Sequence, residues 1–307
     1  MKSIVLYSII GASAIAVGAG AGTVYKRCFV APSEKIEGFN PNNCKPNAEE
    51  LFKKVEKAGS VKNAVQQLKP FEIVNYAFEK YKACEYSVSF CTGMAKTIID
   101  QEIRSAQIKR GTTYFEEQIS KSSMVGVGKR MIQEGEEADT KVYNETGSGD
   151  VLIEGTNVHT SFKSEVQTLT YEQYKEAWGR NLPDMAIYLI AESTVDKQEI
   201  EETSNGYKVT LELQPQKGAY NYRYQMKTIS GLDDYPSFQF LNLTYELTKD
   251  LEMRSMVEKS KFHALMGVSV DIDNTLNYYY FPNEESMIPE ITEDFDYAKY
   301  TEKEGQR

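Results

Sequence analysis

The sequence predicts an α+β domain in which helices cover one face of an antiparallel β-sheet, preceded by an apolar N-terminal helix. Three observations support this fold class: a segment without charges at the N-terminus, amphipathic helical segments after it, and alternating polarity along much of the remaining chain. Alternation is typical of antiparallel strands with one buried and one hydrated face. Because the buried face must be covered, the helices are expected to pack on it.

The N-terminal segment is predicted to cross a membrane as a single helix. No charged residue occurs from Ser3 to Tyr25, and about 20 apolar residues span a hydrocarbon core of about 30 Å. A cleaved signal peptide is the alternative, since Ala19-Gly20-Ala21 offers a small-x-small cleavage site. The apolar bulk of the segment comes from Ile4, Val5, Leu6, Ile9, Ile10, Ile15 and Val17.

The orientation of this anchor is argued from the charges beside it. Lys26 and Arg27 outweigh Lys2, which favours a C-terminal flank inside the cell. The short N-terminal tail and the signal-like sequence favour the opposite, and large domains cross largely regardless of charge. We therefore expect a single-pass protein of the cell membrane with an extracytoplasmic domain.

The four cysteines are candidates for two disulfides. Cys28, Cys44, Cys84 and Cys91 all lie in the first third of the chain, and an even count after an anchor fits an oxidising compartment. If one extended strand joins Cys84 and Cys91, they lie about 23 Å apart at about 3.3 Å per residue. A disulfide needs Cα atoms within about 7 Å. Four unpaired thiols are the alternative.

The chain is divided into four parts. The anchor covers residues 1–27, and residues 28–46 form a linker rich in Pro and Asn. The α+β domain covers residues 47–282, and residues 283–307 form an acidic tail.

Three helices are predicted at the start of the domain. Asn47 with Glu50 has the spacing of a capping box, residues 60–68 follow as a short helix, and Pro70 begins a third helix that reaches Tyr81.

Further along the chain, two more helices and a series of strands are predicted. Thr170 with Gln173 begins one helix, and residues 219–230 form the other. Residues 144–149 are expected to form a polar loop, and Asp273-Asn274 a turn. The strand-like segments are residues 86–90, 98–108, 112–119, 125–133, 141–143, 207–213, 241–247, 268–272 and 276–280.

Composition excludes some classes of function. The net charge of -10 repels phosphate backbones, so nucleic acid is not an expected partner. The two histidines, His159 and His263, have no ligand-like neighbours in sequence, and we expect neither a metal site nor a cofactor.

No cluster of residues has the pattern of a catalytic site. Asp271 and Asp273 share one face of a strand, but turn chemistry explains them better than acid/base work. Glu192 with Asp271 would suggest a hydrolase only if the two met in a cleft. The tyrosines that could form a recognition surface or, more simply, a core are Tyr220, Tyr222, Tyr224, Tyr278, Tyr279 and Tyr280.

In its final third the chain runs FLNLTYELTKDLEMRSMVEKSKFHALMGVSVDIDNTLNYYYF. This series of amphiphilic hairpins resembles envelope proteins of the bacterial lipoprotein-carrier type. The resemblance is one of pattern over residues 47–282, and no diagnostic motif is shared. It implies a curved antiparallel sheet, half-barrel-like, that wraps around helices and holds an acyl chain.

The sequence thus favours a non-catalytic envelope domain that binds an apolar ligand, such as a lipid or acyl chain, in the concavity of a curved sheet. The alternative is a protein-interaction or sensor module that docks another envelope protein. The membrane is the expected partner in both cases.

Deleting Met1 to Tyr25 should yield a folded protein that no longer sediments with membranes, because the strands beyond Cys84 carry their own apolar face. Fractionation of full-length and truncated chains, with circular dichroism of the soluble form, measures this. Aggregation of the truncated chain in an oxidising buffer would contradict a self-sufficient domain.

Overall fold

A computed structural model describes residues 34–97, 100–122, 128–136, 142–148, 163–170, 172–173, 188–230, 232, 234–264 and 267–280. The predicted anchor, Cys28 and the acidic tail lie outside these ranges. None of the helices in the described part combines the length and apolar composition that a membrane span requires.

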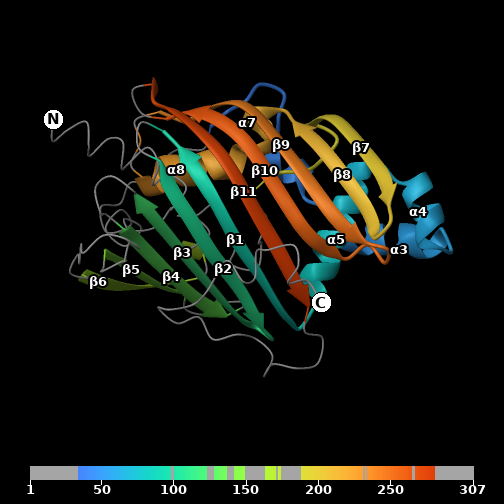
Figure 1. Ribbon diagram of the computed structural model, residues 1–307, viewed down its shortest axis with the longest axis horizontal. Helices are drawn as coiled ribbons and strands as arrows, with labels where there is room; N and C mark the ends of the chain where they lie inside the picture. Colours follow the sequence, from blue (N-terminus) through green and yellow to red (C-terminus); the bar gives the residue numbers. More distant parts are fainter. Residues whose placement is uncertain are drawn as a thin grey trace.

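The strands of the described chain form one open antiparallel sheet of eleven, which bends around the helices (Figure 1). Its order is β6-β5-β4-β3-β2-β1-β11-β10-β9-β8-β7, so two meanders meet where the first strand pairs with the last. The strands are β1 (Tyr86–Lys96), β2 (Gln101–Arg110), β3 (Thr113–Ser122), β4 (Gly128–Glu136), β5 (Val142–Ser148), β6 (Lys163–Leu169), β7 (Val195–Thr203), β8 (Gly206–Leu213), β9 (Ser237–Thr248), β10 (Met253–His263) and β11 (Ser269–Tyr280).

The helices begin where the capping residues predict. The Asn47 side chain accepts a hydrogen bond from the backbone of Glu50, and Thr170 and Gln173 bond each other reciprocally. Helix α5 has Pro70 in its first turn, where the missing N–H costs nothing. The helical elements are η1 (Pro41–Cys44), α3 (Ala48–Lys57), α4 (Val61–Gln67), α5 (Pro70–Ala83), α7 (Pro215–Gly218) and α8 (Tyr220–Ser230).

Helix α5 packs on one face of the sheet, which we call the inner face; the opposite face is the outer face. Phe78 and Tyr81 of α5 make edge-on contacts with Tyr245 of β9 and Tyr278 of β11. Helix α8 closes the other end of this core, where Tyr222 contacts Phe238. Helices from the start and the middle of the chain therefore cover the apolar face, as the alternation predicts (Figure 1).

A smaller core lies on the outer face of the central strands. It contains four fully buried side chains, Val88, Phe90, Ala106 and Ile108. Tyr279 packs against it and contacts Phe90 edge-on.

The expected turn at Asp273-Asn274 and the expected loop at residues 144–149 are both wrong. β11 runs without a break through Asp273 and Asn274, and β5 extends to Ser148. In β11 the strongly strand-forming residues on both sides, together with pairing to β1 and β10, override the local turn preference of Asp and Asn.

Strands β6, β7 and β10 are missing from the sequence prediction. In β6 only Val166 and Leu169 are apolar. β7 is an edge strand whose side chains are nearly all at least partly exposed, so it shows no alternation. In β10 the irregularity between Met253 and Ser255 breaks the alternation, and further along the polar side chains of Glu258 and Ser260 on the buried face obscure it.

Residues 34–46, assigned from sequence to a linker, make specific contacts with α8 and its neighbours. Glu34 forms a bidentate ion pair with Arg223, which also donates to the carbonyl of Pro236 at 2.7 Å. The Tyr220 hydroxyl donates to the Glu34 carbonyl at 2.9 Å, and the Phe39 ring packs edge-on against Tyr220. The chain entering the domain is thereby attached to α8.

Replacing Glu34 by Gln should lower the free energy of unfolding by about 2–3 kcal/mol, because it weakens hydrogen bonds to a buried guanidinium and removes its counter-charge, while Glu34 itself is partly exposed. The Arg223 side chain is only 5% exposed. Urea unfolding measures the effect. The matched control is Glu49→Gln, which breaks the exposed pair with Lys53 and should leave the midpoint nearly unchanged. Equal losses in both variants would contradict a special role for the Glu34 pair.

Candidate functional site

A buried carboxyl lies at the centre of the inner face. Glu258 of β10 is 4% exposed, and the strand register sets Leu243 of β9 on one side of it and Asn274 of β11 on the other. The same row continues to Gly93 of β1 and Ile103 of β2. Two polar residues thus interrupt a row that is otherwise apolar or without a side chain.

Neighbouring side chains hold the Glu258 carboxyl in place. Ser260 donates to Oε1 at 2.8 Å, and the Asn274 amide donates to Oε2 at 3.3 Å. The Tyr188 ring reaches the carboxyl from the segment before β7, but its hydroxyl does not have good hydrogen-bond geometry. Side chains of β10 and β11 therefore orient the carboxyl, and the Tyr188 ring lies next to it on the inner side of the sheet.

Burial raises the pKa of the Glu258 carboxyl above its usual value. The nearby Tyr188 hydroxyl and the hydrogen bonds from Ser260 and Asn274 oppose the shift, and the charge of Asp273 adds to it. The pKa of Tyr222, which also faces this carboxyl, is raised by its own burial and by Glu258. The neutral form of Glu258 is consequently favoured over a wider pH range than for an exposed glutamate.

Two polar atoms beside Glu258 have no hydrogen-bond partner in the structure. They are the hydroxyl of Tyr188, which is 7% exposed, and Oδ1 of Asn274, which is 6% exposed. An unpaired buried polar atom costs about 1–3 kcal/mol. Two such atoms next to one buried carboxyl are a candidate site for a polar group from outside the domain.

Gly93 makes room for the Asn274 side chain. A Cβ atom at this position would lie 1.9 Å from Asn274 Oδ1 and 2.7 Å from the backbone oxygen of Asp273. The whole inner face of β1, the central strand, carries small side chains. They are Ser87, Ser89, Cys91, Gly93 and Ala95.

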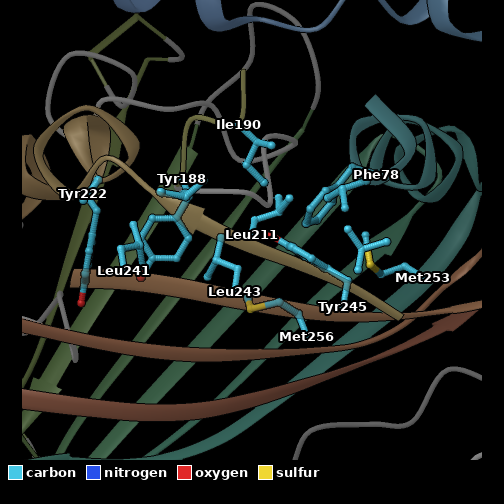
Figure 2. Packing of buried hydrophobic residues seen from close by; sticks show 14 of the residues in the cluster. Phe78, Tyr188, Ile190, Leu211, Tyr222, Leu241, Leu243, Tyr245, Met253 and Met256 are labelled. Carbon is cyan, nitrogen blue, oxygen red and sulfur yellow. The ribbon is translucent and has the colours of Figure 1, made fainter. Parts of the chain in front are cut away.

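The walls around this centre are apolar. Figure 2 shows Tyr222 and Tyr188 at one end, Phe78 of α5 at the other, and side chains of the strands between them. Leu211, Leu241 and Leu243 are fully buried in this wall. The arrangement combines a long apolar surface with a short polar row at the middle of the sheet.

The inner face is partly accessible at β2. Ser105 points to the inner face opposite Cys91, yet its side chain is of intermediate exposure, as is Gln107 two residues further on. Helix α5 contacts β11 through Tyr278 and β2 through Lys109, which donates to the Lys82 carbonyl at 2.6 Å. Ser105 and Gln107 lie on the same face of β2 beyond Lys109, and their side chains are partly exposed.

The cysteines predicted to form disulfides are free thiols where the structure describes them. Cys44, Cys84 and Cys91 are unpaired, and Cys28 lies outside the described residues. Cys91 is inside β1, where burial raises the pKa of its thiol to about 12. Cys44 is buried against Ser193 at 3.6 Å, an additional contact of the segment that enters the domain.

The carboxylates considered from sequence are not brought together. Asp271 pairs with Lys261 at 3.0 Å on the outer face, and Asp273 lies on the same face. Glu192 pairs with Lys69 at the start of α5. Within the described residues, no three His, Cys, Asp or Glu side chains gather closely enough to hold a metal ion.

The tyrosines contribute mainly to the core. Tyr222 and Tyr278 are buried in it, and Tyr220 contacts the segment that enters the domain. His263 lies at the end of β10 beside Gln239, and His159 is outside the described residues.

Glu258 was missed because its strand was missed. Met256 and Phe262 lie inside the core at a period of two, and Glu258 and Ser260 fall between them on the same face. That spacing would have revealed an inward-facing carboxylate. It was obscured because a charged residue in a strand is normally assigned to the hydrated face.

Comparisons with known proteins do not assign a family. No protein-family model matches the chain. No curated protein matches it either.

Two solved structures show a remote likeness. One is described as MucB in complex with MucA(peri), with 6% identity, a TM-score of 0.12, and coverage of 76% of this chain and 94% of that chain. The other is an N-terminal dehydratase from the difficidin assembly line, with 10% identity, a TM-score of 0.12, and coverage of 67% and 82%. Likenesses this weak carry no argument, so the lipoprotein-carrier resemblance stays a prediction.

Replacing Glu258 by Gln should flatten the dependence of stability on pH. A carboxyl whose pKa is raised by folding contributes stability that is fully present below its unfolded pKa, about 4.3. That contribution is lost as pH rises through the folded pKa. Free energies of unfolding between pH 4 and pH 8 should therefore fall more steeply for the wild type than for E258Q.

The control for this experiment is Glu212→Gln, which removes a carboxyl paired with Lys197 on the surface. It should keep the wild-type slope over this range. Identical slopes for the wild type and E258Q would show that the Glu258 carboxyl titrates as it does in the unfolded chain.

Proposed function

We propose that the protein is a non-catalytic, membrane-anchored envelope domain whose inner sheet face binds an apolar ligand, such as a lipid or an acyl chain. The observation that carries the proposal is the combination of a buried apolar wall on β8 to β10 with small side chains along β1 and partial exposure at β2. Ligand sites of this kind are mostly apolar, with a few well-placed polar groups.

The sheet provides the shape that this function requires. It is open, since β6 and β7 are its edges, and it bends toward the face that α5 covers (Figure 1). A chain-like ligand lying along β1 would contact backbone and small side chains below it and aromatic rings beside it. Its burial would contribute about 0.8 kcal/mol per methylene.

The membrane-anchored and extracytoplasmic parts of the proposal rest on the N-terminal sequence. The charge-free run from Ser3 to Tyr25 supports them. Attachment of Glu34 to α8 supports a domain that begins soon after this run.

The apolar surface of the described residues is concentrated on the inner face. Among the described residues, the exposed large hydrophobic side chains are Phe52 of α3, at 37%, and Phe240 on the outer face of β9, at 39%, and they lie on separate elements. The inner face, not an external patch, is therefore the surface on which we place the ligand.

Purified full-length protein, isolated in a mild detergent and then extracted with organic solvent, should release a stoichiometric apolar compound by mass spectrometry. Ser105→Trp should reduce the amount severalfold, because a large ring at this half-buried inner position occupies ligand space. The matched control is Thr244→Trp, at a half-buried position on the outer face of β9. Ligand recovery unaffected by the Ser105 change, or no ligand and no uptake of added fatty acid by the wild type, would contradict the proposal.

A further inference from the structure

Two polar side chains lie beside the Glu258 carboxyl on the inner face. Asn274 donates to it through its amide and carries the acceptor Oδ1, and Tyr188 brings a hydroxyl close to it. Oδ1 of Asn274 and the Tyr188 hydroxyl have no hydrogen-bond partner of good geometry, and all three side chains are more than nine-tenths buried. The glycine at position 93 leaves the space that Asn274 occupies.

No described lysine, arginine or histidine provides a counter-charge for Glu258. The groups that act on it are Tyr188, Ser260, Asn274 and Asp273, and none of them is a cation. Buried carboxylates are normally paired with a cation or bound to a metal. The site is therefore acidic in character, apolar in its surroundings and without a positive partner among the described residues.

We propose that Glu258, Asn274 and Tyr188 form a subsite for the ammonium group of an amphiphilic ligand whose apolar chain lies on the inner face. This inference rests on the proposed function and specifies its ligand class as an amine-bearing amphiphile. An alkylammonium head has three N–H donors and no acceptor, so it can donate to the Glu258 carboxyl, to Oδ1 of Asn274 and to the Tyr188 oxygen.

The aromatic residues around the subsite favour the same ligand. Tyr188 and Tyr222 pack edge-on with ring centroids 6.0 Å apart, and Tyr245 lies on the neighbouring strand with its titration influenced by Glu258. Tyrosine rings near a carboxyl stabilise a cation through their negative faces, most strongly where water is excluded. A carboxylate head would instead be repelled by Glu258, and a hydroxyl head would supply only one donor.

Three probes with the same chain test the head group: dodecylamine, 1-dodecanol and sodium dodecanoate. Their affinities for the full-length protein are measured by calorimetry below the micellar concentration. The amine should bind at least about tenfold more tightly than the alcohol, as expected for hydrogen bonds to a charged group. The dodecanoate should bind most weakly.

Substitutions test whether the preference for the amine over the alcohol arises at this subsite. Glu258→Gln should abolish the advantage of the amine while leaving alcohol binding within about twofold, and Tyr188→Phe should reduce it severalfold while keeping the ring. The control is Asp271→Asn, which removes one negative charge from the outer face of β11. It should leave the preference unchanged, so that general attraction to an acidic protein is excluded.

The outcomes separate this inference from the function on which it rests. Equal binding of amine and alcohol, or an amine advantage that survives Glu258→Gln, would overturn the ammonium subsite but leave the apolar ligand site intact. Failure of all three probes to bind would overturn the proposed function itself.

Discussion

Pairing between β1 and β11 is the constraint on which the rest of the structure depends. These are the first and the last strand of the described chain, yet they form the centre of the sheet and join its two meanders. Their register sets Gly93 opposite Asn274, and the register of β11 with β10 sets Asn274 opposite Glu258. A slip of one residue would turn these side chains to the other face of the sheet.

The polar pair Glu258 and Asn274 is energetically unfavourable within the apolar core. A carboxyl at this position is less favourable than a leucine such as Leu243 beside it, since its hydration is lost and only two described hydrogen bonds replace it. Stability alone therefore gives no reason for Glu258. The ammonium subsite proposed above would give one, and it would also account for the unpaired atoms of Asn274 and Tyr188 beside it.

Local patterns predicted local structure well. The starts of α3 and α5 and the strand β8 follow from capping residues and alternation that are visible within a few residues. The pairing of the first strand with the last could not be derived, because nothing in a single sequence specifies which distant strands become neighbours. Asp273-Asn274 shows the converse limit, since pairing on both sides outweighs the preference of this dipeptide for a turn.

The candidate site was unpredictable for the same reason. Its residues come from separate strands and from the segment before β7, and each of them alone has an ordinary role in sequence. What makes them a site is that the sheet places a buried acid, an amide and a phenol together, and burial then raises the pKa of the acid. From the sequence alone, the one sign of the site is the spacing of Glu258 from Met256 and Phe262, which puts all three side chains on the same face of β10.

Attachment of Glu34 to Arg223 limits how far the domain can lie from the bilayer. If the chain leaves the bilayer near Arg27, as we propose, only seven residues connect that point to Glu34. A fully extended chain covers at most about 3.3–3.6 Å per residue, so this connecting segment is no longer than about 25 Å. The α8 end of the domain would then stay within reach of the lipid head groups. An amphiphile passing between the bilayer and the sheet would have only a short aqueous path to cross.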